Sequence, residues 1–339
     1  MTQRRKSVVT GGRGFVGYHL VDALMARGDE VTVIDMADSA HRNDVRYIRA
    51  DICEEEAMRR AVEGADVIFH SASVVHTKQN LVDQVWRVNL GGTETVMRAC
   101  EKEGVPRIVY VSSASAVYEG NDIRNGDETM PYSRISQAPY ADSKIAAEKA
   151  VLSANGTKFA TCAIRPHVIF GPGDRRFIPN ILKRAKQGTL RVAVGREKKK
   201  LSDFTYIDNL IDAMLKADAA LAPGSKVAGQ AYFITNGEPM GFWDFVEIFI
   251  EKYGSKPLVG SVPYPIAYGI AAVVEGLDTL RGGTLGQEDG FTRFAIKYMC
   301  TDHYFSIAKA KRDFGYEPKI DIRGGIDRTI AQLRATGQA

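Results

Sequence analysis

Only four cysteines occur among the 339 residues, and Cys53, Cys100, Cys162 and Cys300 are scattered with no CxxC pair among them. This scatter excludes the cysteine spacing of a structural zinc site and leads us to expect reduced thiols. The sequence also lacks a cluster of Asp, His and Glu that would predict another metal site. No apolar stretch precedes the first strand, so we expect no signal peptide and a cytoplasmic protein.

The chain also has only a small excess of positive charge. The formal net charge is +4, and the basic runs at 4–6 and 198–200 are short and have no aromatic residues interleaved. They favour a solvated surface and give no support to nucleic-acid binding. The composition, 45% hydrophobic and 25% charged, is typical of a soluble globular protein, and the length suits one large α/β unit with a smaller lobe.

Apolar segments alternate with segments of helical periodicity through the first half of the chain. The predicted strands lie at 6–10, 30–35, 45–52, 66–72, 107–112 and 159–170. The helices predicted between them lie at 15–27, 54–63, 81–103 and 139–155. This alternation predicts a parallel sheet with right-handed crossovers, which is a Rossmann-type doubly wound α/β fold.

The regularity falls after Pro172. A helix at 209–216, a strand at 231–235 and a helix at 242–253 are still predicted. We expect residues 1–171 to form a dinucleotide-binding domain, to which the segment at about 203–236 returns. Residues 172–202 and 237–339 are expected to form a smaller C-terminal substrate-binding lobe.

One helical segment of this lobe has an apolar face made of Ile266, Ile270, Val273, Val274 and Leu277. Its uninterrupted apolar run is too short to cross about 30 Å of hydrocarbon. Three interpretations remain open: helix packing inside the lobe, a roof over an apolar substrate pocket, and a peripheral contact with a membrane surface.

A glycine-rich turn at residues 10–17, TGGRGFVG, follows the first strand and begins the first helix. Its glycines satisfy both the GxGxxG and the GxxGxxG spacing. Glycine permits the tight turn, allows the backbone to approach a pyrophosphate and lets the helix pack closely on the strand. The turn predicts a dinucleotide site that includes Gly11, Gly14, Phe15, Val16 and Gly17.

Asp35 ends the second predicted strand. A carboxylate there accepts hydrogen bonds from the adenosine ribose hydroxyls and repels a 2′-phosphate, which favours NAD over NADP. Arg13 and Arg42 are the basic residues that would instead favour NADP. Three further residues lie at the ends of other predicted strands, namely Asp51, Ile52 and Ala72. Each of them either lines the cofactor or is simply the end of its strand.

Tyr140 is the only one of the fourteen tyrosines that has a lysine four residues further along, Lys144. Four residues is about one helical turn, so both side chains project from the same face. A nearby cation favours the ionised form of a phenol, whose pKa is otherwise about 10. The pair is therefore equipped to move a proton while a bound nicotinamide moves a hydride.

The order of glycine loop, Asp35, serine-rich strand end and Tyr140–Lys144 resembles the extended short-chain dehydrogenase/reductase superfamily. Longer segments are similar to its 3β-hydroxysteroid dehydrogenase family, namely 111–120 (VSSASAVYEG), 126–128 (GDE), 163–172 (AIRPHVIFGP), 203–206 (DFTY), 233–236 (FITN) and 304–310 (YFSIAKA). Its most similar branches are the decarboxylating sterol-4α-carboxylate 3-dehydrogenases and the bacterial 3β-hydroxysteroid or cholesterol dehydrogenases. The resemblance extends over about residues 7–330.

The resemblance implies an enzyme in which Tyr140, as tyrosinate, takes the proton of a secondary hydroxyl. Lys144 lowers the pKa of that tyrosine and holds the nicotinamide ribose, so both residues also belong to the cofactor site. Ser113 hydrogen-bonds the same substrate oxygen.

The choice of serine depends on the alignment. An alignment on the sugar-nucleotide members places this position on Ala114, and Ser112 and Ser115 are alternatives to Ser113. Pro166 lines the nicotinamide, and Ser112 is included in the cofactor site. His167 is either a member of the site or an ordinary residue of the pocket wall.

The implied reaction is NAD-dependent oxidation of the 3β-hydroxyl of a sterol or steroid to the 3-ketone. On a substrate with a 4α-carboxylate the product is a β-keto acid, which loses CO2 as its electrons delocalise into the ketone, so no metal is required. The partners implied are the cofactor and a sterol or steroid, and a homodimer is compatible with the resemblance.

Four alternatives stay open. Two are oxidoreductases, namely a 3β-hydroxysteroid dehydrogenase with Δ5–Δ4 isomerase activity and a β-keto acid reductase. The third is a nucleotide-sugar epimerase or dehydratase, for which Arg175, Arg176 and Lys183 would bind a second phosphate pair. The fourth is a dinucleotide-sensing regulator, which would not need the Tyr140–Lys144 pair.

Overall fold

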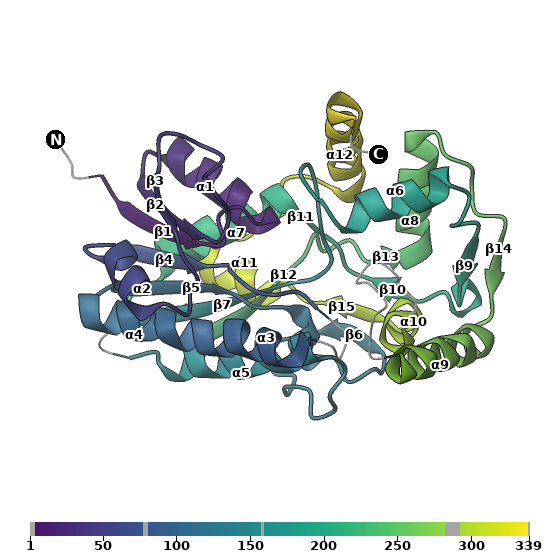
Figure 1. The fold of residues 1–339 in the computed structure, drawn as a ribbon, viewed down its shortest axis with the longest axis horizontal. Helices are drawn as coiled ribbons and strands as arrows, with labels where there is room; N and C mark the ends of the chain where they lie inside the picture. The colour runs from purple at the N-terminus through teal and green to yellow at the C-terminus, as the bar shows by residue number, and fades with distance from the viewer. Residues whose placement is uncertain (1–3, 77–80, 157–158, 282–291, 338–339) are drawn as a thin grey trace.

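A computed structural model describes residues 4–76, 81–156, 159–281 and 292–337. Its centre is a seven-stranded sheet of order β12-β7-β5-β4-β1-β2-β3, in which all neighbouring strands are parallel. Figure 1 shows this sheet between two layers of helices. The strands are β1 (Lys6–Thr10), β2 (Glu30–Asp35), β3 (Arg46–Arg49), β4 (Val67–His70), β5 (Arg107–Val111), β7 (Ala160–Pro166) and β12 (Gln230–Ile234).

Helices cover both faces of the sheet, which confirms the doubly wound fold. One layer contains α2 (Glu55–Val62), α4 (Thr93–Glu103) and α5 (Pro139–Ser153), and the other contains α1 (Phe15–Arg27), α7 (Ile207–Ala220) and α11 (Ala308–Phe314). The strand order reverses between β1 and β4. Such a reversal is the usual ligand-binding position of an open α/β sheet.

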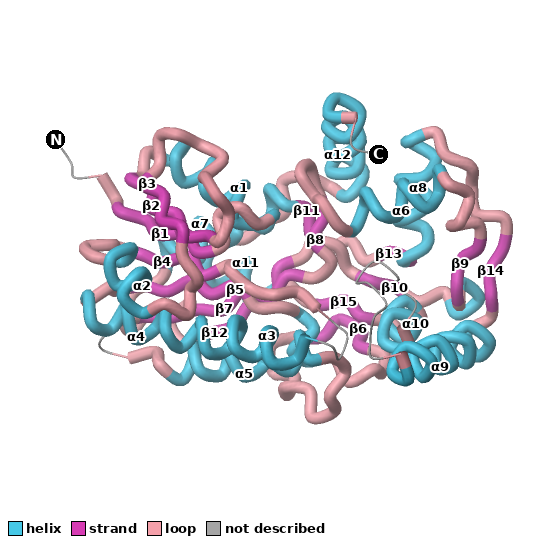
Figure 2. The backbone as a smooth tube through the Cα atoms, viewed as in Figure 1, coloured by secondary structure: helices cyan, strands magenta, loops and turns pink. Residues whose placement is uncertain are grey.

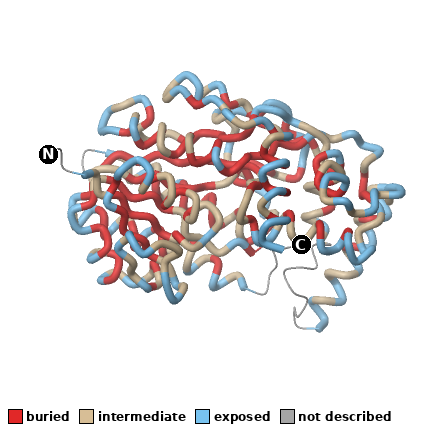
Figure 3. Tube along the Cα trace, turned by 90° about the horizontal axis from the view of Figure 1, so that it is seen from above, coloured by how far each residue is buried: buried red, intermediate tan, exposed pale blue. Residues whose placement is uncertain are grey.

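Successive strand residues point to opposite faces and supply both layers of core. Val8 packs with Ile34 and Ile68 on one face, whereas Val9 packs with Val33 and Phe69 on the other. Both faces are thus apolar, as expected for a parallel sheet that is covered on each side. Figure 3 shows that buried residues gather in the centre of the molecule and exposed residues at its edge.

Two predicted elements are interrupted in the structure. The strand predicted at 159–170 ends at Pro166 and resumes as β8 (Ile169–Phe170), because Val168 has a φ of +36° that a strand does not permit. The helix predicted at 81–103 consists of α3 (Val82–Trp86), a π-helical segment (Arg87–Gly92) and α4. Both irregularities lie near the carboxyl edge of the sheet.

The rest of the chain forms a mixed α/β region beside this edge (Figure 2). It includes short sheets of order β13-β10-β15-β6, β11-β8 and β14-β9. Its strands are β6 (Ile123–Gly126), β9 (Val192–Val194), β10 (Leu201–Ser202), β11 (Thr205–Tyr206), β13 (Met240–Gly241), β14 (Gly260–Val262) and β15 (His303–Phe305). Its helices are α6 (Phe177–Lys186), α8 (Phe242–Tyr253), α9 (Tyr264–Leu280), α10 (Arg293–Met299) and α12 (Ile322–Thr336).

Helix α9 contains the predicted apolar face. In the described part of the chain this helix buries only Ala267 and Ala271, while Ile270 is 48% exposed and Val273 is 63% exposed. The face therefore does not pack inside the lobe in the way that the first interpretation required. Among the described residues, no helix is both long enough and apolar enough to cross a membrane.

Candidate active site

The glycine turn lies at the reversal of strand order. Gly11 has a φ of +70°, and a Cβ on it would lie 2.8 Å from the Cα of Ala72 at the end of β4. A Cβ on Gly17 would lie 2.2 Å from the carbonyl oxygen of Gly11. No other residue type fits these two positions, so the glycines allow β1, β4 and α1 to meet closely.

Gly14 precedes the first residue of α1, and since glycine has no side chain, the first turn of the helix has no side-chain cap. No acidic residue occupies this turn, which begins with the half-buried Phe15 and Val16. Free backbone N–H groups at such a helix start fit an anionic pyrophosphate. The structure thus brings together the predicted loop residues in an arrangement that suits a dinucleotide.

The carboxylate of Asp35 lies over the start of this loop. It accepts hydrogen bonds from the backbone N–H groups of Arg13, at 2.9 Å, and Ala37, at 3.1 Å. Arg42 instead pairs with Asp22, at 3.0 Å, and Asp44, at 2.7 Å. The guanidinium of Arg42, which would be needed to bind the 2′-phosphate of NADP, is therefore already paired with two carboxylates.

The two residues predicted beside the third strand have different surroundings. Asp51 is partly exposed and forms an ion pair with Arg87 at 2.8 Å. Ile52 is buried, and its side chain packs so closely on Gly92 that a Cβ there would lie 2.5 Å from Ile52 Cδ1. The side chain of Ile52 therefore belongs to the core.

Tyr140 and Ser113 meet at the ends of α5 and β5. The Ser113 hydroxyl lies close enough to the phenol to lower the pKa of Tyr140. Ser113 Oγ also accepts hydrogen bonds from the backbone N–H of Ser115, at 3.2 Å, and from its hydroxyl, at 2.9 Å. The single hydroxyl proton of Ser113 therefore stays free of these two bonds. Burial raises the pKa of Tyr140 to about 12, and the hydroxyl of Ser113 opposes this rise.

The other candidate serines have different tasks in this arrangement. Ser112 Oγ is buried and has no hydrogen-bond partner among the described residues, while Ser115 supports Ser113. Among the three serines, Ser113 is the one whose hydroxyl lowers the pKa of Tyr140.

Lys144 lies one helical turn beyond Tyr140 and is 2% exposed. Its Nζ donates a hydrogen bond to the carbonyl oxygen of Val111 at 2.5 Å and lies 4.4 Å from the ring centroid of Tyr110. Burial lowers the pKa of Lys144 to about 7, and the carboxylate of Glu148 opposes this shift. The ammonium is thus held beside the strand end that leads to Ser113.

Sequence analysis missed the ion pair behind Lys144. Arg165 on β7 binds Glu148 with three hydrogen bonds of 2.5–3.1 Å, and both side chains are at most 4% exposed. Tyr132 donates a further hydrogen bond of 2.8 Å to the same carboxylate. The signal available was the glutamate at the next helical turn after Lys144.

Asn89 braces the backbone of Tyr140. Its amide donates to the hydroxyl of Ser143 at 2.9 Å, and that hydroxyl donates to the carbonyl oxygen of Tyr140 at 2.8 Å. Asn89 also exchanges two hydrogen bonds with the backbone of Val74, at 2.7 and 3.0 Å. The π-helical segment that carries Asn89 is therefore joined to the first turn of α5.

Pro166 ends β7, and His167 follows it into a buried polar cluster with Tyr298 and His303. Register places this strand end beside that of Ser113, because Val111 pairs with Ile164. His167 thus belongs to a hydrogen-bonded group rather than to a simple apolar wall.

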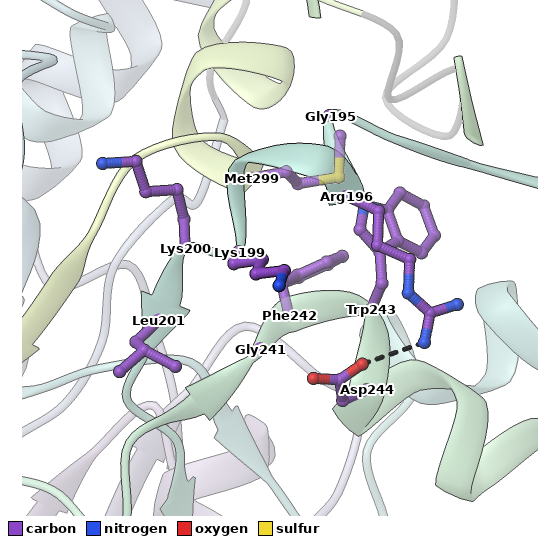
Figure 4. A pocket seen from close by; sticks show the side chains of 10 residues that line it. All are labelled: Gly195, Arg196, Lys199, Lys200, Leu201, Gly241, Phe242, Trp243, Asp244 and Met299. Atoms are coloured by element: carbon purple, nitrogen blue, oxygen red, sulfur yellow. Dashed lines mark hydrogen bonds and ion pairs between the residues drawn. The ribbon is translucent and has the colours of Figure 1, made fainter. Parts of the chain in front are cut away.

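A cavity of about 430 Å³ opens in the C-terminal region (Figure 4). It has an apolar part, formed by Leu201, Phe242, Trp243 and Met299, and a basic part. The basic residues are Arg196, Lys199 and Lys200. Arg196 is paired with Asp244 at 2.9 Å, and Lys200 is paired with Asp302 at 3.3 Å. The mixture suits an amphipathic molecule better than a purely apolar one.

The doubly wound sheet, the glycine turn and the Ser113–Tyr140–Lys144 group together define an oxidoreductase of the short-chain dehydrogenase/reductase type. The chain belongs to the 3-beta hydroxysteroid dehydrogenase/isomerase family, whose sequence profile matches residues 8–261. The predicted family and enzyme class are thereby confirmed.

Relatives with three different names are similar over nearly the whole chain. The decarboxylating sterol-4-alpha-carboxylate 3-dehydrogenase of Mus musculus is 34% identical over 97% of this chain and 91% of its own length. The 2-alkyl-3-oxoalkanoate reductase of Stenotrophomonas maltophilia is 37% identical over 97% of this chain and 100% of its own. The 3 beta-hydroxysteroid dehydrogenase/Delta 5→4-isomerase of Mycobacterium tuberculosis is 36% identical over 97% and 90%.

Solved structures share the fold. The structure titled gox2253 has a TM-score of 0.80 and 25% identity, with 99% of both chains covered. The UDP-glucose 4-epimerase of Thermotoga maritima has a TM-score of 0.76 and 21% identity, with 98% of this chain and 99% of that chain covered. At this identity the second likeness concerns the fold alone.

Proposed function

We propose that the protein oxidises the 3β-hydroxyl of a sterol that carries a 4α-carboxylate, with NAD as the acceptor, and that the product then loses CO2. The observation that carries the oxidation is the buried Lys144 one helical turn after Tyr140, together with the Ser113 hydroxyl that lowers the pKa of the phenol. The observation that favours the 4α-carboxylate is the family membership, together with the mouse relative named for that substrate.

The residues have separate tasks in the reaction. Ser113 donates a hydrogen bond to the oxygen of the substrate hydroxyl. Tyr140, as tyrosinate, takes the proton of that substrate hydroxyl. Lys144 supplies the positive charge that this tyrosinate needs, since the pKa of Tyr140 in its buried site is about 12. NAD, when bound, accepts the hydride. Gly11, Gly17 and the open first turn of α1 would hold its pyrophosphate.

NAD is proposed over NADP because of the charges at the end of β2. Asp35 presents a carboxylate there, and Arg42 is bound by Asp22 and Asp44. A 2′-phosphate would meet the carboxylate and would have to displace an existing ion pair.

Loss of CO2 requires only that the ketone lie next to the carbon that bears the carboxylate. Breaking the bond to the carboxylate carbon moves its electron pair into an enolate, and a proton then restores the ketone. None of the described residues forms a group of three or more metal-ligating side chains, and this step does not need one.

A second candidate is the interconversion of a 2-alkyl-3-oxoalkanoate with its 3-hydroxy acid. The relative with that name is 37% identical and is covered over its full length. The two printed substrate names describe the same local chemistry, because each places a carboxylate on the carbon next to the carbon that is oxidised or reduced.

The deciding experiment measures kcat/KM in both directions with NAD and NADP. The panel contains a 3β-hydroxysterol with a 4α-carboxylate, the same sterol without it, and a 2-alkyl-3-hydroxyalkanoate. A preference for the carboxysterol, with CO2 released in proportion to NADH, supports the proposal. Equal rates with and without the carboxylate would contradict the decarboxylating assignment, and a preference for the alkanoate would replace it with the second candidate.

A further inference from the structure

His70 lies buried between the glycine turn and the candidate catalytic helix, and the reaction proposed above gives it no task. It ends β4, where it pairs in register with Thr10 of β1, and it is 1% exposed. Its Nδ1 lies 2.7 Å from Thr10 Oγ1, and its Nε2 lies 2.9 Å from Thr93 Oγ1. The ring therefore connects the residue that precedes Gly11 with the first residue of α4.

The direction of each hydrogen bond around His70 is fixed by one carbonyl group. Thr93 Oγ1 lies 2.6 Å from the carbonyl oxygen of Asn89, and a carbonyl only accepts, so this contact uses the single hydroxyl proton of Thr93. The oxygen of Thr93 therefore accepts from His70, whose ring proton is on Nε2. Nδ1 then accepts from the hydroxyl of Thr10, and the oxygen of that hydroxyl accepts from the backbone N–H of Ala72 at 3.2 Å.

From Asn89 the series of hydrogen bonds continues to the candidate catalytic tyrosine. The side-chain amide of Asn89 donates to Ser143 at 2.9 Å, and Ser143 donates to the carbonyl oxygen of Tyr140 at 2.8 Å. Asn89, Thr93 and Ser143 are at most 1% exposed. One buried polar connection thus extends from the residue before the glycine turn, through His70, to the backbone of Tyr140.

The ring of His70 transmits position and does not move protons. Both of its nitrogens already bind hydroxyl groups, and burial lowers its pKa to about 3, with a smaller contribution from the ammonium of Lys144. The ring of Tyr110 packs beside it, with the two centroids 5.6 Å apart. His70 is therefore neutral at physiological pH and has no free nitrogen with which to act on a substrate.

Both ends of this connection are held closely. At the cofactor end, a Cβ on Gly11 would lie 2.8 Å from the Cα of Ala72, so the glycine turn and the end of β4 are in direct contact. At the other end, Asn89 lies in the π-helical segment that precedes α4, a rare backbone form that is frequent at functional sites. A shift of the glycine turn is therefore passed through His70 to the segment that braces the catalytic helix.

We propose that His70 is a positioning residue that couples the dinucleotide site to Tyr140. It holds the glycine turn, which places NAD, in a fixed relation to the first turn of α5, which places the phenol. Hydride transfer and proton transfer act on the same carbinol group, so both acceptors must be in place at once. This inference rests on the oxidation in the proposed function and is independent of which of its two substrates is correct.

Thr93→Val is the first test, because it removes the hydroxyl that joins His70 to Asn89 and nearly keeps the volume of the side chain. Thr95→Val is the matched control. Thr95 lies on the same helix, is 4% exposed and donates to the carbonyl oxygen of Gly91 at 3.0 Å, outside the connection. Each variant loses a hydroxyl bond to the carbonyl four residues before it, so the melting temperatures report the structural cost that the two share.

The measurements are kcat and KM with NAD and two hydroxy acids, together with the Kd of NAD by titration. The acids are a 3β-hydroxysterol with a 4α-carboxylate and a 2-alkyl-3-hydroxyalkanoate. Thr93→Val is expected to lower kcat by roughly 10²-fold, which is the effect of a misplacement of about 1 Å, while the Kd of NAD stays within a few-fold of the parent. Thr95→Val is expected to retain the kcat of the parent.

His70 itself is replaced in two ways, with rates normalised to the concentration of NAD-binding sites. The amide nitrogen of Gln reaches the place of the histidine Nε2 and can donate to Thr93, whereas Leu has no polar atom. His70→Gln is therefore expected to retain about 10-fold more of the kcat than His70→Leu. A purely structural role would not distinguish the two variants after this normalisation.

Equal kcat in Thr93→Val and Thr95→Val, or in His70→Gln and His70→Leu, would overturn the inference and leave the proposed function in place. A parent protein that oxidises neither hydroxy acid would overturn the proposed function and this inference with it.

Discussion

Arg165 and Glu148 form a buried ion pair directly behind the candidate catalytic lysine. Their side chains are 4% and 0% exposed, and the hydrogen bonds from Arg165 to the carboxylate are 2.5–3.1 Å long. Glu148 lies one helical turn beyond Lys144 on α5 and opposes the effect of burial on the pKa of that lysine. This ion pair thus joins β7 to α5, and its carboxylate also favours the charged form of Lys144.

Replacing Glu148 with Gln is expected to leave Arg165 buried without its counter-charge. Removing one partner of such a pair costs about 3–5 kcal/mol, so we expect a clearly lower free energy of unfolding in urea. The exposed Glu94→Gln on α4 is the matched control and should have little effect. A variant at position 148 as stable as the control would show that the pair contributes nothing net.

Tyr140→Phe should reduce kcat by about 10²-fold or more while NAD binding and the melting temperature are retained, because only the ionisable oxygen is lost. Ser113→Ala should reduce kcat more than Ser112→Ala or Ser115→Ala, since Ser113 is the serine whose hydroxyl lowers the pKa of Tyr140. Steady-state kinetics and NAD titration check both expectations. If Ser112→Ala had the largest effect of the three, the serine would be misassigned.

Asp35→Ala should narrow the difference in kcat/KM between NAD and NADP, because the carboxylate that repels a 2′-phosphate is removed. The double variant with Arg42→Ala separates the role of the nearby guanidinium, which Asp22 and Asp44 bind in the parent. Equal efficiency of the parent with both cofactors would refute the assignment of NAD.

Asp203 predicts a pH dependence of stability. Burial raises its pKa to about 7, from 3.8, and one of its carboxylate oxygens has no hydrogen-bond partner among the described residues. The folded protein therefore retains a proton that the unfolded chain loses between about pH 4 and pH 7, so this group makes stability fall as the pH rises through that window.

Asp203→Asn should remove this loss. The variant should resemble the parent near pH 4 and be more stable at pH 8, by at most about 4 kcal/mol, as measured by urea unfolding at both pH values. Asp302 is the comparison, because its pKa is lowered although burial opposes this, and Asp302→Asn should lower stability at pH 8. A pH-independent difference between the parent and Asp203→Asn would disprove the assignment.

The exposed face of α9 stays a predicted contact with a membrane surface or substrate. Ile270 is 48% exposed, and Glu275 on the same helix forms an ion pair with Arg293. Changing Ile270 and Val274 to Ser should weaken liposome binding or raise the KM for a sterol, with NAD affinity unchanged. Identical sterol kinetics and liposome association in parent and variant would leave this face with neither role.

The sequence by itself determined the parts of the protein that local patterns control. The glycine turn has almost no freedom, because Gly11 and Gly17 contact backbone atoms, and the alternation of apolar strands and periodic helices defines a parallel sheet. Helix α1 and strand β2 have the predicted bounds because their apolar periodicity agrees with their end residues. Tyr140 and Lys144 share one helix, so their spacing alone placed them together.

Only the tertiary structure decided which distant residues meet. The effect of Ser113 on the pKa of Tyr140 distinguishes among three serines, because it depends on how the end of β5 faces α5. The hydrogen-bonded group of Tyr298, His167 and His303 joins segments more than 130 residues apart. Such contacts depend on packing between strands and helices that no local pattern encodes. For the same reason, the apolar face of α9 did not by itself determine whether that face is buried, because burial depends on which elements pack against it.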